Sequence, residues 1–142
     1  MKFLCDTTVL FAASDSAHMH HGRSLALVTG AKPAHAFVAV HSLAELYATL
    51  SATPTPRMRP LPLVLESVEH VARVFTPVTA TRDDYLWVLR YTARSGGRSG
   101  QVYDALILKC AERAGVEAVY TWNTAHFRRI AWPSVVSRIA EP

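Results

Sequence analysis

Residues 2–8 of the chain, KFLCDTT, decide the fold that the sequence predicts. Lys2–Cys5 is a short, largely apolar run that predicts a β-strand, and the polar residues Asp6, Thr7 and Thr8 end it. Runs of the same kind predict further strands at Phe37–Val40, Phe75–Val78, Ala118–Thr121 and Val135–Ile139. Longer helical patterns separate these runs, and such alternation predicts a parallel sheet with helices on both faces. In that fold ligands bind beyond the carboxyl ends of the strands, where the strand order switches.

The helices expected between the strands are marked by apolar residues at helical spacing. They are predicted at Arg23–Val28, Leu43–Leu50, Leu63–Val74, Leu86–Ala93 and Tyr103–Ala114. Ser42, followed three residues later by Glu45, has the pattern of a capping box for the second helix. Thr81 with Asp84 has a similar pattern at the fourth. The proline-rich segment TPTPRMRPLP, residues 53–62, leaves too little chain on either side for two cores, so it is expected to join two helices as a surface loop or arm.

Length and composition narrow the class of protein. The chain has 142 residues, 50% hydrophobic and 18% charged, which excludes a disordered chain and suits one compact domain over residues 1–142. No apolar run approaches the roughly 18 residues of a membrane-spanning helix, and the first residues lack the apolar region of a signal peptide. Cys5 and Cys110 lie in apolar stretches without a CxxC partner, which predicts buried, reduced thiols in a cytoplasmic protein.

The net charge of +4 comes mostly from arginine, with 12 Arg and 3 Lys. Arginine suits planar, bidentate contact with phosphate, so an anionic partner such as nucleic acid is one interpretation. Codon bias that replaces Lys by Arg is the other. The charge alone is therefore a weak indication of function.

Three of the 11 acidic residues occupy positions that favour chemistry. Asp6 follows the first strand, Glu45 lies in an apolar helix face, and Asp104 opens the most apolar helix. Each has a structural alternative, since Asp6 could cap a turn, Glu45 could complete the capping box, and Asp104 could be a helix N-terminal acid. The remaining acids are interpreted as solvated or helix-end charges: Asp15, Glu66, Glu69, Asp83, Asp84, Glu112, Glu117 and Glu141.

Together the three acids predict a metal site at the edge of the sheet. Carboxylates gathered there would repel one another and raise their pKa values unless a cation lay between them. Carboxylate oxygens without Cys or well-spaced His ligands suit Mg²⁺ or Mn²⁺ better than zinc, and such a site can support phosphodiester hydrolysis. Asn123, which follows the fourth predicted strand, could give an amide oxygen to the metal or bind its water, or it could be an ordinary turn residue.

At these positions the sequence resembles the PIN-domain ribonucleases and, within them, the VapC-type toxins of bacterial toxin–antitoxin pairs. The matching segments, in family order, are FLCDTTVL (residues 3–10), SLAELYATL (42–50), GQVYDALIL (100–108) and TWNTAHF (121–127). The resemblance spans essentially the whole chain. It implies a single PIN domain over residues 1–142, built as a three-layer α/β/α sandwich around a parallel sheet, with acidic residues around one or two Mg²⁺ ions.

The resemblance makes Asp6, Glu45 and Asp104 the metal ligands of a metal-dependent ribonuclease. Water would be the nucleophile, with Glu45 or Asp104 as general base through a bound water, and the products would carry a 3′-hydroxyl and a 5′-phosphate. Asn123 completes the expected catalytic set at a position where many members have Asp. That difference removes one negative charge and weakens the case for a second metal.

Supporting residues and partners are implied in the same way. Thr8 and Thr121 are expected to support the first aspartate. Arg94 and Arg98, near the glycine-rich loop, are candidates for holding the RNA backbone, with a solvated loop charge as the alternative. RNA is the implied substrate, a homodimer and a cognate antitoxin are the implied assemblies, and no membrane is expected to take part. The alternative to a toxin is a catalytically silent PIN-like scaffold that binds RNA or protein.

The histidines are interpreted as structural residues. The cluster at residues 18–21, HMHH, lacks further ligands at the spacing that zinc requires, so it is expected at the surface or in packing. His126 is expected to be structural and hydrogen-bonded near the site. His41 and Ser42 could suggest a hydrolase triad, but no G-x-S-x-G turn is present to expose the serine.

Overall fold

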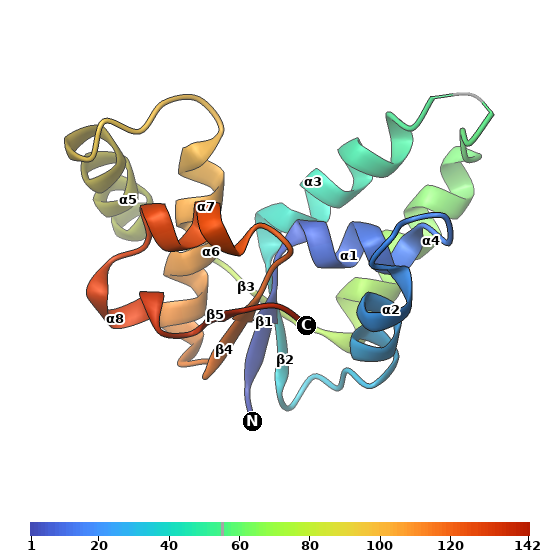
Figure 1. Cartoon of the computed structure of the whole chain (residues 1–142), viewed down its shortest axis with the longest axis horizontal. Coiled ribbons are helices and arrows are strands. Elements are labelled where there is room, and N and C mark those ends of the chain that lie inside the picture. Colours follow the sequence, from blue (N-terminus) through green and yellow to red (C-terminus); the bar gives the residue numbers. More distant parts are fainter. Residues whose placement is uncertain (55) are drawn as a thin grey trace.

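The computed structural model describes residues 1–54 and 56–142 and arranges them around a parallel sheet (Figure 1). In these residues the sheet has five strands: β1 (Phe3–Cys5), β2 (Ala36–Ala39), β3 (Thr76–Val78), β4 (Ala118–Tyr120) and β5 (Ile139–Ala140). The helices of the same residues are α1 (Thr7–Ser14), α2 (His21–Thr29), α3 (Val40–Ser51), α4 (Leu61–Val74), α5 (Arg82–Arg94), α6 (Gln101–Ala114), α7 (Thr124–Ile130) and α8 (Pro133–Val136). The predicted alternation of strands and helices is confirmed.

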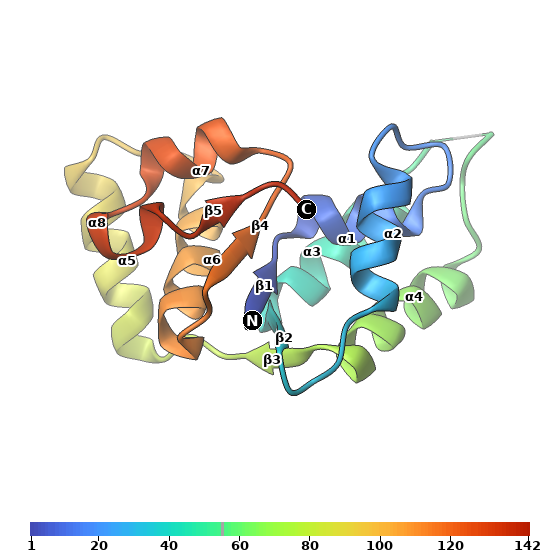
Figure 2. The same ribbon diagram turned by 60° about the horizontal axis from the view of Figure 1, so that its bottom comes forward.

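The strand order β3-β2-β1-β4-β5 explains why helices cover both faces of the sheet. The chain first runs outward from β1 to β3 and then returns to place β4 on the other side of β1. Because crossovers between parallel strands are right-handed, these two directions put α1–α4 on one face and α5 and α6 on the other, as Figures 1 and 2 show. The predicted three-layer α/β/α sandwich is confirmed.

Strand β1 contributes to the core on both faces. Phe3 and Cys5 pack into the apolar cluster under α1–α4, whereas Leu4 packs into the cluster under α6, α7 and α8. Successive side chains of a strand point to opposite faces, so a strand covered on both faces is apolar at every position. The first polar side chain after β1 is that of Asp6, at the carboxyl edge of the sheet.

The strand order switches between β1 and β4. The two strands pair in parallel with Cys5 opposite Tyr120, and the backbone N–H of Asp6 donates to the carbonyl oxygen of Tyr120 (2.9 Å). Asp6 and Thr121, the residues that follow the two strands, therefore lie next to each other. This is the place at which open parallel sheets bind their ligands.

The cap predicted at Ser42 is wrong. Helix α3 begins at Val40, directly after β2, with Ala39 as its N-cap. Ser42 consequently lies inside the first turn and is buried, and the capping box with Glu45 is not formed. The side chain of Glu45 is left free for contacts outside its own helix.

Three other segments differ from the prediction, and one of them is α7 at Thr124–Ile130, which was not predicted. The strand predicted at Val135–Ile139 is wrong, because Pro133–Val136 forms α8 and only Ile139–Ala140 pairs with β4. Proline fixes the backbone angle that the first turn of a helix needs, so Pro133 favours a helix here. Helix α1 at Thr7–Ser14 was not predicted. Its local sequence is β-branched at the start, and it is stabilised mainly by burying one face in the core.

The remaining local predictions agree with the structure. The capping box of Thr81 and Asp84 is present at α5. Both cysteines are buried and free. Residues 53–54 and 56–60 lie between α3 and α4 as expected, whereas Leu61 and Pro62 already belong to α4, and Thr55 lies outside the described residues. Within the described ranges, every helix is too short or too polar to cross a membrane.

Candidate active site

Asp6 lies at the centre of the site, after β1 and before α1. It is 2% exposed, and its Oδ2 accepts hydrogen bonds from Thr8 Oγ1 (2.7 Å) and Thr121 Oγ1 (2.8 Å). Burial raises the pKa of Asp6, and the two hydroxyl donors oppose this rise. The backbone N–H of Asn123 donates to Thr121 Oγ1 (3.0 Å), which leaves the hydroxyl hydrogen of Thr121 for Asp6. The two threonines that the sequence associates with Asp6 thus both contact it.

Glu45 reaches the same edge from α3. Its Oε2 accepts a hydrogen bond from Thr7 Oγ1 (3.0 Å), and its Oε1 lies 3.6 Å from His41 Nε2, one turn earlier in the helix. Within the described residues Oε1 is buried without a hydrogen-bond partner. A buried acceptor without a donor is costly, which favours a ligand at this oxygen. Sequence reasoning missed Thr7 and His41, although the four-residue spacing of His41 and Glu45 was a signal for the second.

Asp104 lies in the first turn of α6 and faces like charges. Burial, and then the negative charges of Asp6 and Glu45, raise the pKa of Asp104 to about 7. Its Oδ2 lies 2.9 Å from Nε2 of His126 in α7, and the guanidinium of Arg129 lies 2.8 Å from Nδ1 of the same ring. A guanidinium can only donate, so Nδ1 accepts and Nε2 carries the hydrogen that points to Asp104. His126 is hydrogen-bonded to Arg129 near the site, as expected.

The four residues predicted to be catalytic line one pocket of about 550 Å³. Its lining consists of Asp6, Thr7, Thr8, Phe11, His18, Met19, His20, Glu45, Thr49, Asp104, Trp122 and Asn123. Asn123 is the exposed N-cap residue of α7, and its side chain makes no capping hydrogen bond within residues 1–54 and 56–142. Its amide is therefore free to face the pocket. Residues from four distant segments of the chain meet here because parallel strands end at the same edge.

The donors of this pocket fit a hard divalent cation in their chemistry. Carboxylate and amide oxygens are the ligands that Mg²⁺ and Mn²⁺ prefer, and positive charge would relieve the repulsion that raises the pKa of Asp104. In the part of the chain that the structure describes, however, no three His, Cys, Asp or Glu side chains are gathered closely enough to form a metal site as they stand. A cation would have to draw the carboxylates together.

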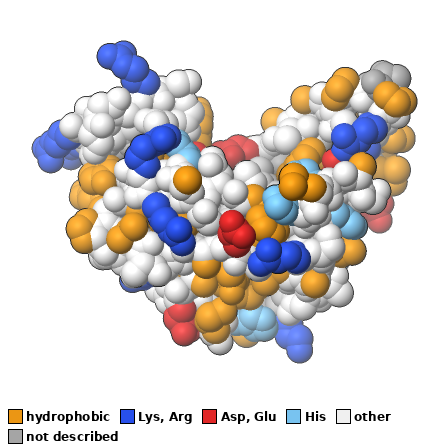
Figure 3. All heavy atoms as spheres, in the orientation of Figure 1, with side chains coloured by type: hydrophobic (Ala, Val, Ile, Leu, Met, Phe, Trp, Pro, Cys, Tyr) orange, Lys and Arg blue, Asp and Glu red, His pale blue; other side chains and the backbone are white. Residues whose placement is uncertain are grey.

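The two arginines predicted to hold RNA do not line the pocket. Arg94 ends α5 and Arg98 lies in the loop that follows. Figure 3 shows basic side chains on both lobes of the molecule, on either side of a central hollow that has acidic side chains. Arg129 is linked to the site through His126, and it also borders the glycine-rich loop.

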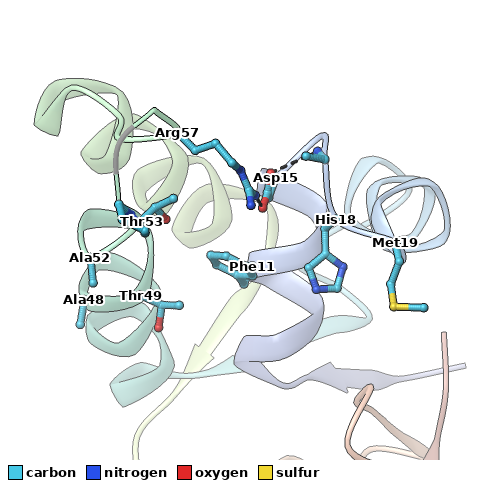
Figure 4. Close-up of a pocket in the computed structure, with 11 residues that line it drawn as sticks. Phe11, Asp15, His18, Met19, Ala48, Thr49, Ala52, Thr53 and Arg57 are labelled. Atoms are coloured by element: carbon cyan, nitrogen blue, oxygen red, sulfur yellow. Dashed lines mark hydrogen bonds and ion pairs between the residues drawn. The ribbon is translucent and has the colours of Figure 1, made fainter.

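A second hollow, of about 850 Å³, adjoins the pocket (Figure 4). The two share Phe11, His18, Met19 and Thr49. Its other side holds Asp15, which the sequence suggested was a solvated charge. That interpretation is wrong, since Asp15 is 5% exposed and ion-paired with Arg57 of the proline-rich segment. The two residues are far apart in sequence, so no local pattern could have paired them.

Comparison with known proteins places this geometry in a family. The model of the family described as "PIN domain" matches residues 3–133. No curated protein matches the sequence. Among solved structures the chain is similar to Mycobacterium tuberculosis VapC20, described as a sarcin-ricin loop cleaving toxin, with a TM-score of 0.71 and 16% identity over 88% of this chain and 92% of that chain.

Two further solved structures are similar. One is VapBC2 from Rickettsia felis bound to a DNA fragment from its promoter, with a TM-score of 0.67 and 16% identity over 100% of this chain and 99% of that chain. The other, from Pyrobaculum aerophilum, has a TM-score of 0.67 and 14% identity over 98% of this chain and 83% of that chain. At such low identities these likenesses establish the fold.

Proposed function

This chain belongs to the PIN-domain family, and we propose that it is the ribonuclease toxin of a toxin–antitoxin pair, dependent on a divalent cation. The observation that carries the proposal is the pocket in which Asp6, Glu45, Asp104 and Asn123 line one hollow at the β1–β4 switch. A scaffold without catalysis has no reason to bring three carboxylates to one pocket, where burial and then the charges of Asp6 and Glu45 raise the pKa of Asp104. A nuclease that uses a cation has such a reason.

Asp6, Glu45 and Asp104 are the proposed ligands of a Mg²⁺ or Mn²⁺ ion. When bound, the ion would polarise the scissile phosphate and make a water molecule easier to deprotonate. Asp6 is suited to a fixed ligand because two hydroxyl groups hold it in a buried position. Asn123 contributes an uncharged oxygen, which supports one ion rather than two.

Glu45 is the better placed of the two candidate general bases. Its Oε1 has no donor within the described residues, whereas Asp104 Oδ2 already lies 2.9 Å from Nε2 of His126. Glu45 would take a proton from the attacking water as the new bond to phosphorus forms. The bond from phosphorus to the 3′-oxygen would break, that oxygen would take a proton from solvent water to become a 3′-hydroxyl, and the phosphate would stay on the 5′-oxygen of the other fragment.

The solved neighbours support the biological role. VapC20 is described as a toxin that cleaves the sarcin-ricin loop, and VapBC2 is a complex captured on promoter DNA. By analogy we expect an antitoxin encoded next to this chain and a homodimer of the chain itself. Growth arrest on expression that the neighbouring open reading frame relieves would support the pair. A monomer in light scattering at micromolar concentration would argue against the dimer.

A catalytically silent scaffold that binds RNA or protein is the second candidate. Asn123, in place of the usual aspartate, favours it, as does the open spacing of the carboxylates. The two candidates differ in one measurable property, which is metal-dependent strand cleavage.

Cleavage of bulk cellular RNA with and without Mg²⁺ tests the proposal. The unsubstituted protein is expected to cleave only with the cation, and Asp6→Asn or Asp104→Asn to abolish cleavage. Asp83→Asn, the same change at an exposed site on α5, is the matched control. Cleavage that continues unchanged in folded Asp6→Asn and Asp104→Asn proteins would overturn the site.

A further inference from the structure

One wall of the site pocket is made of flat rings. Phe11 of α1, His18 and His20 of the turn before α2, and Trp122 after β4 all line the pocket, and we refer to them as the ring wall. Ring centroids are 5.9 Å apart from Phe11 to His18, 5.6 Å from His18 to His20, and 3.8 Å from His20 to Trp122. The last pair is stacked, with planes 8° apart.

Hydrogen bonds hold the ring wall in place without a ligand. Trp122 Nε1 donates to the hydroxyl of Ser24 (2.8 Å), which is fully buried in α2. The backbone N–H of His20 donates to Nδ1 of His18 (3.1 Å), and the ring of His21 is hydrogen-bonded to a carbonyl of α1 (2.9 Å). Rings that are already fixed lose little conformational freedom when a partner stacks on them.

The ring wall is also accessible. His18, His20 and Trp122 are only partly buried, and Met19 beside them is 87% exposed. His18 and Met19 border both the site pocket and the second hollow, and Figure 4 shows them at the second hollow. Phe11 and Trp122 also pack against the apolar core under α1–α4, and the imidazoles of His18 and His20 line the pocket beside them.

We infer that the ring wall binds an unpaired nucleobase of the RNA strand whose phosphate lies at the carboxylates. The inference rests on the proposed nuclease function. Single-stranded RNA offers bases that stack on aromatic and histidine side chains, and every base has a flat face for this contact. The guanidinium of Arg23 lies over the ring of Trp122, 5.1 Å from its centroid, so a third ring extends the stacked pair of His20 and Trp122 at His20. A base held there fixes the strand along the pocket and determines which phosphate faces Asp6 and Asp104.

Binding of two single-stranded hexamers tests the subsite. One probe is oligoadenylate and the other is a ribose-phosphate hexamer of equal charge without bases. Fluorescence anisotropy measures their affinity for Asp104→Asn protein in Mg²⁺, which prevents turnover. Oligoadenylate is expected to bind roughly 10- to 100-fold more tightly than the probe without bases.

Variants of the ring wall are then added to the Asp104→Asn protein. His20→Ala and Trp122→Leu are expected to remove most of the preference for bases, and His20→Phe, which keeps a flat ring, to retain it. His70→Ala changes an exposed histidine of α4 outside the pocket and should have no effect. Thermal melting checks that each variant is folded. His20 lies in a surface turn, so His20→Ala tests the wall even if Trp122→Leu unfolds.

Equal binding of the two probes, or an unchanged preference in folded His20→Ala protein, would overturn the subsite. A cleavage assay on bulk RNA with the unsubstituted protein distinguishes a failure of the subsite from a failure of the nuclease proposal. Cleavage with no base preference overturns the subsite alone. A base preference that depends on the ring wall, without any cleavage, supports the subsite and overturns the nuclease.

Discussion

Helix α6 carries two partly buried carboxylates with opposite electrostatics. Asp104, in its first turn, has a pKa raised to about 7 by burial and by the charges of Asp6 and Glu45. Glu112 lies two turns further along, roughly 12 Å away. Burial acts to raise its pKa too, but three donors outweigh burial and lower it to about 2. Those donors are Lys109 Nζ (2.7 Å), Ser134 Oγ (2.6 Å) and Trp132 Nε1 (3.1 Å).

The difference between the two acids separates stability from function. Glu112 has hydrogen-bond and ion-pair partners supplied by the fold, so its negative charge stabilises the native state. Asp104 is partly buried near two like charges and has one histidine beside it, so its ionised form destabilises the native state unless a cation is bound. One end of α6 therefore holds a carboxylate that stabilises the fold, Glu112, and the other end holds a carboxylate whose ionised form is destabilised, Asp104.

Neutralising each acid should have opposite consequences. Asp104→Asn is expected to reduce RNA cleavage by at least about 100-fold, because it removes a proposed metal ligand, and to leave stability unchanged or higher at pH 8 without divalent cations. Glu112→Gln is expected to keep cleavage within a few-fold and to lower the free energy of unfolding by roughly 1–3 kcal/mol. Cleavage rates and thermal melts of both proteins check this. Loss of cleavage in folded Glu112→Gln protein would contradict the assignment of Glu112 to stability alone.

The two acids should also differ in how stability depends on pH. The folded-state pKa of Asp104 lies above its unfolded value of 3.8, so between these values the native state binds more protons. Stability without divalent cations is therefore expected to fall as pH rises from about 4 through 7. The pKa of Glu112 is lowered, so its contribution is present above about 4.5 and is lost only as pH falls towards 2.

Melting temperatures at pH 5.5 and pH 8, with and without Mg²⁺, measure this dependence. Mg²⁺ should stabilise the protein more at pH 8 than at pH 5.5, because it binds the ionised carboxylates of the native state. Asp104→Asn should flatten the slope, with the remainder due to Asp6, whose pKa is also raised. Glu112→Gln should leave the slope between pH 5.5 and pH 8 unchanged. A slope of the opposite sign in the unsubstituted protein would contradict the assignment to Asp104.

The meeting of Asp6 and Asn123 at one edge could be predicted from the sequence for a physical reason. Apolar runs that end in polar residues mark buried parallel strands, and their carboxyl ends share an edge of the sheet. Glu45 and Asp104 were found for a related reason, since an acid in an apolar helix face is out of place unless it serves a site. The signal behind all four is a buried strand or helix face next to each residue, and the apolar neighbours in the sequence indicate that burial.

What could not be predicted depends on contacts between distant segments. Thr7–Ser14 forms α1 because the core accepts its face, and the local sequence alone does not require a helix there. The pattern from Ser42 to Glu45 suggested a cap, but β2 ends at Ala39 and the helix starts too early for it. Asp15 looked solvated because its partner Arg57 lies 42 residues away.

A milder test of the contrast between site and structural carboxylates removes one hydroxyl donor from each kind. Thr121→Val deletes a donor to Asp6 and is expected to lower cleavage by about 10- to 100-fold, the usual effect of losing a partner that orients a ligand. Ser134→Ala deletes a donor to Glu112 and should cost about 1 kcal/mol of stability with cleavage unchanged. Cleavage rates and thermal melts of the two variants check this. Lower cleavage in folded Ser134→Ala protein, with normal cleavage in Thr121→Val protein, would contradict the comparison.

The smallest expected effect concerns Arg129, which touches Asp104 only through His126. Its guanidinium makes Nδ1 of the ring an acceptor and so directs the hydrogen on Nε2 towards Asp104. Arg129→Met should let the second tautomer appear and lower cleavage by a few-fold, about the weaker end of the usual effect for such partners. Ring ¹⁵N shifts of His126 report the tautomer independently of activity. Arg113→Met, which removes an ion pair with Asp84 instead, should change neither the His126 shifts nor cleavage. Unchanged His126 shifts in Arg129→Met would mean that Asp104 alone fixes the ring.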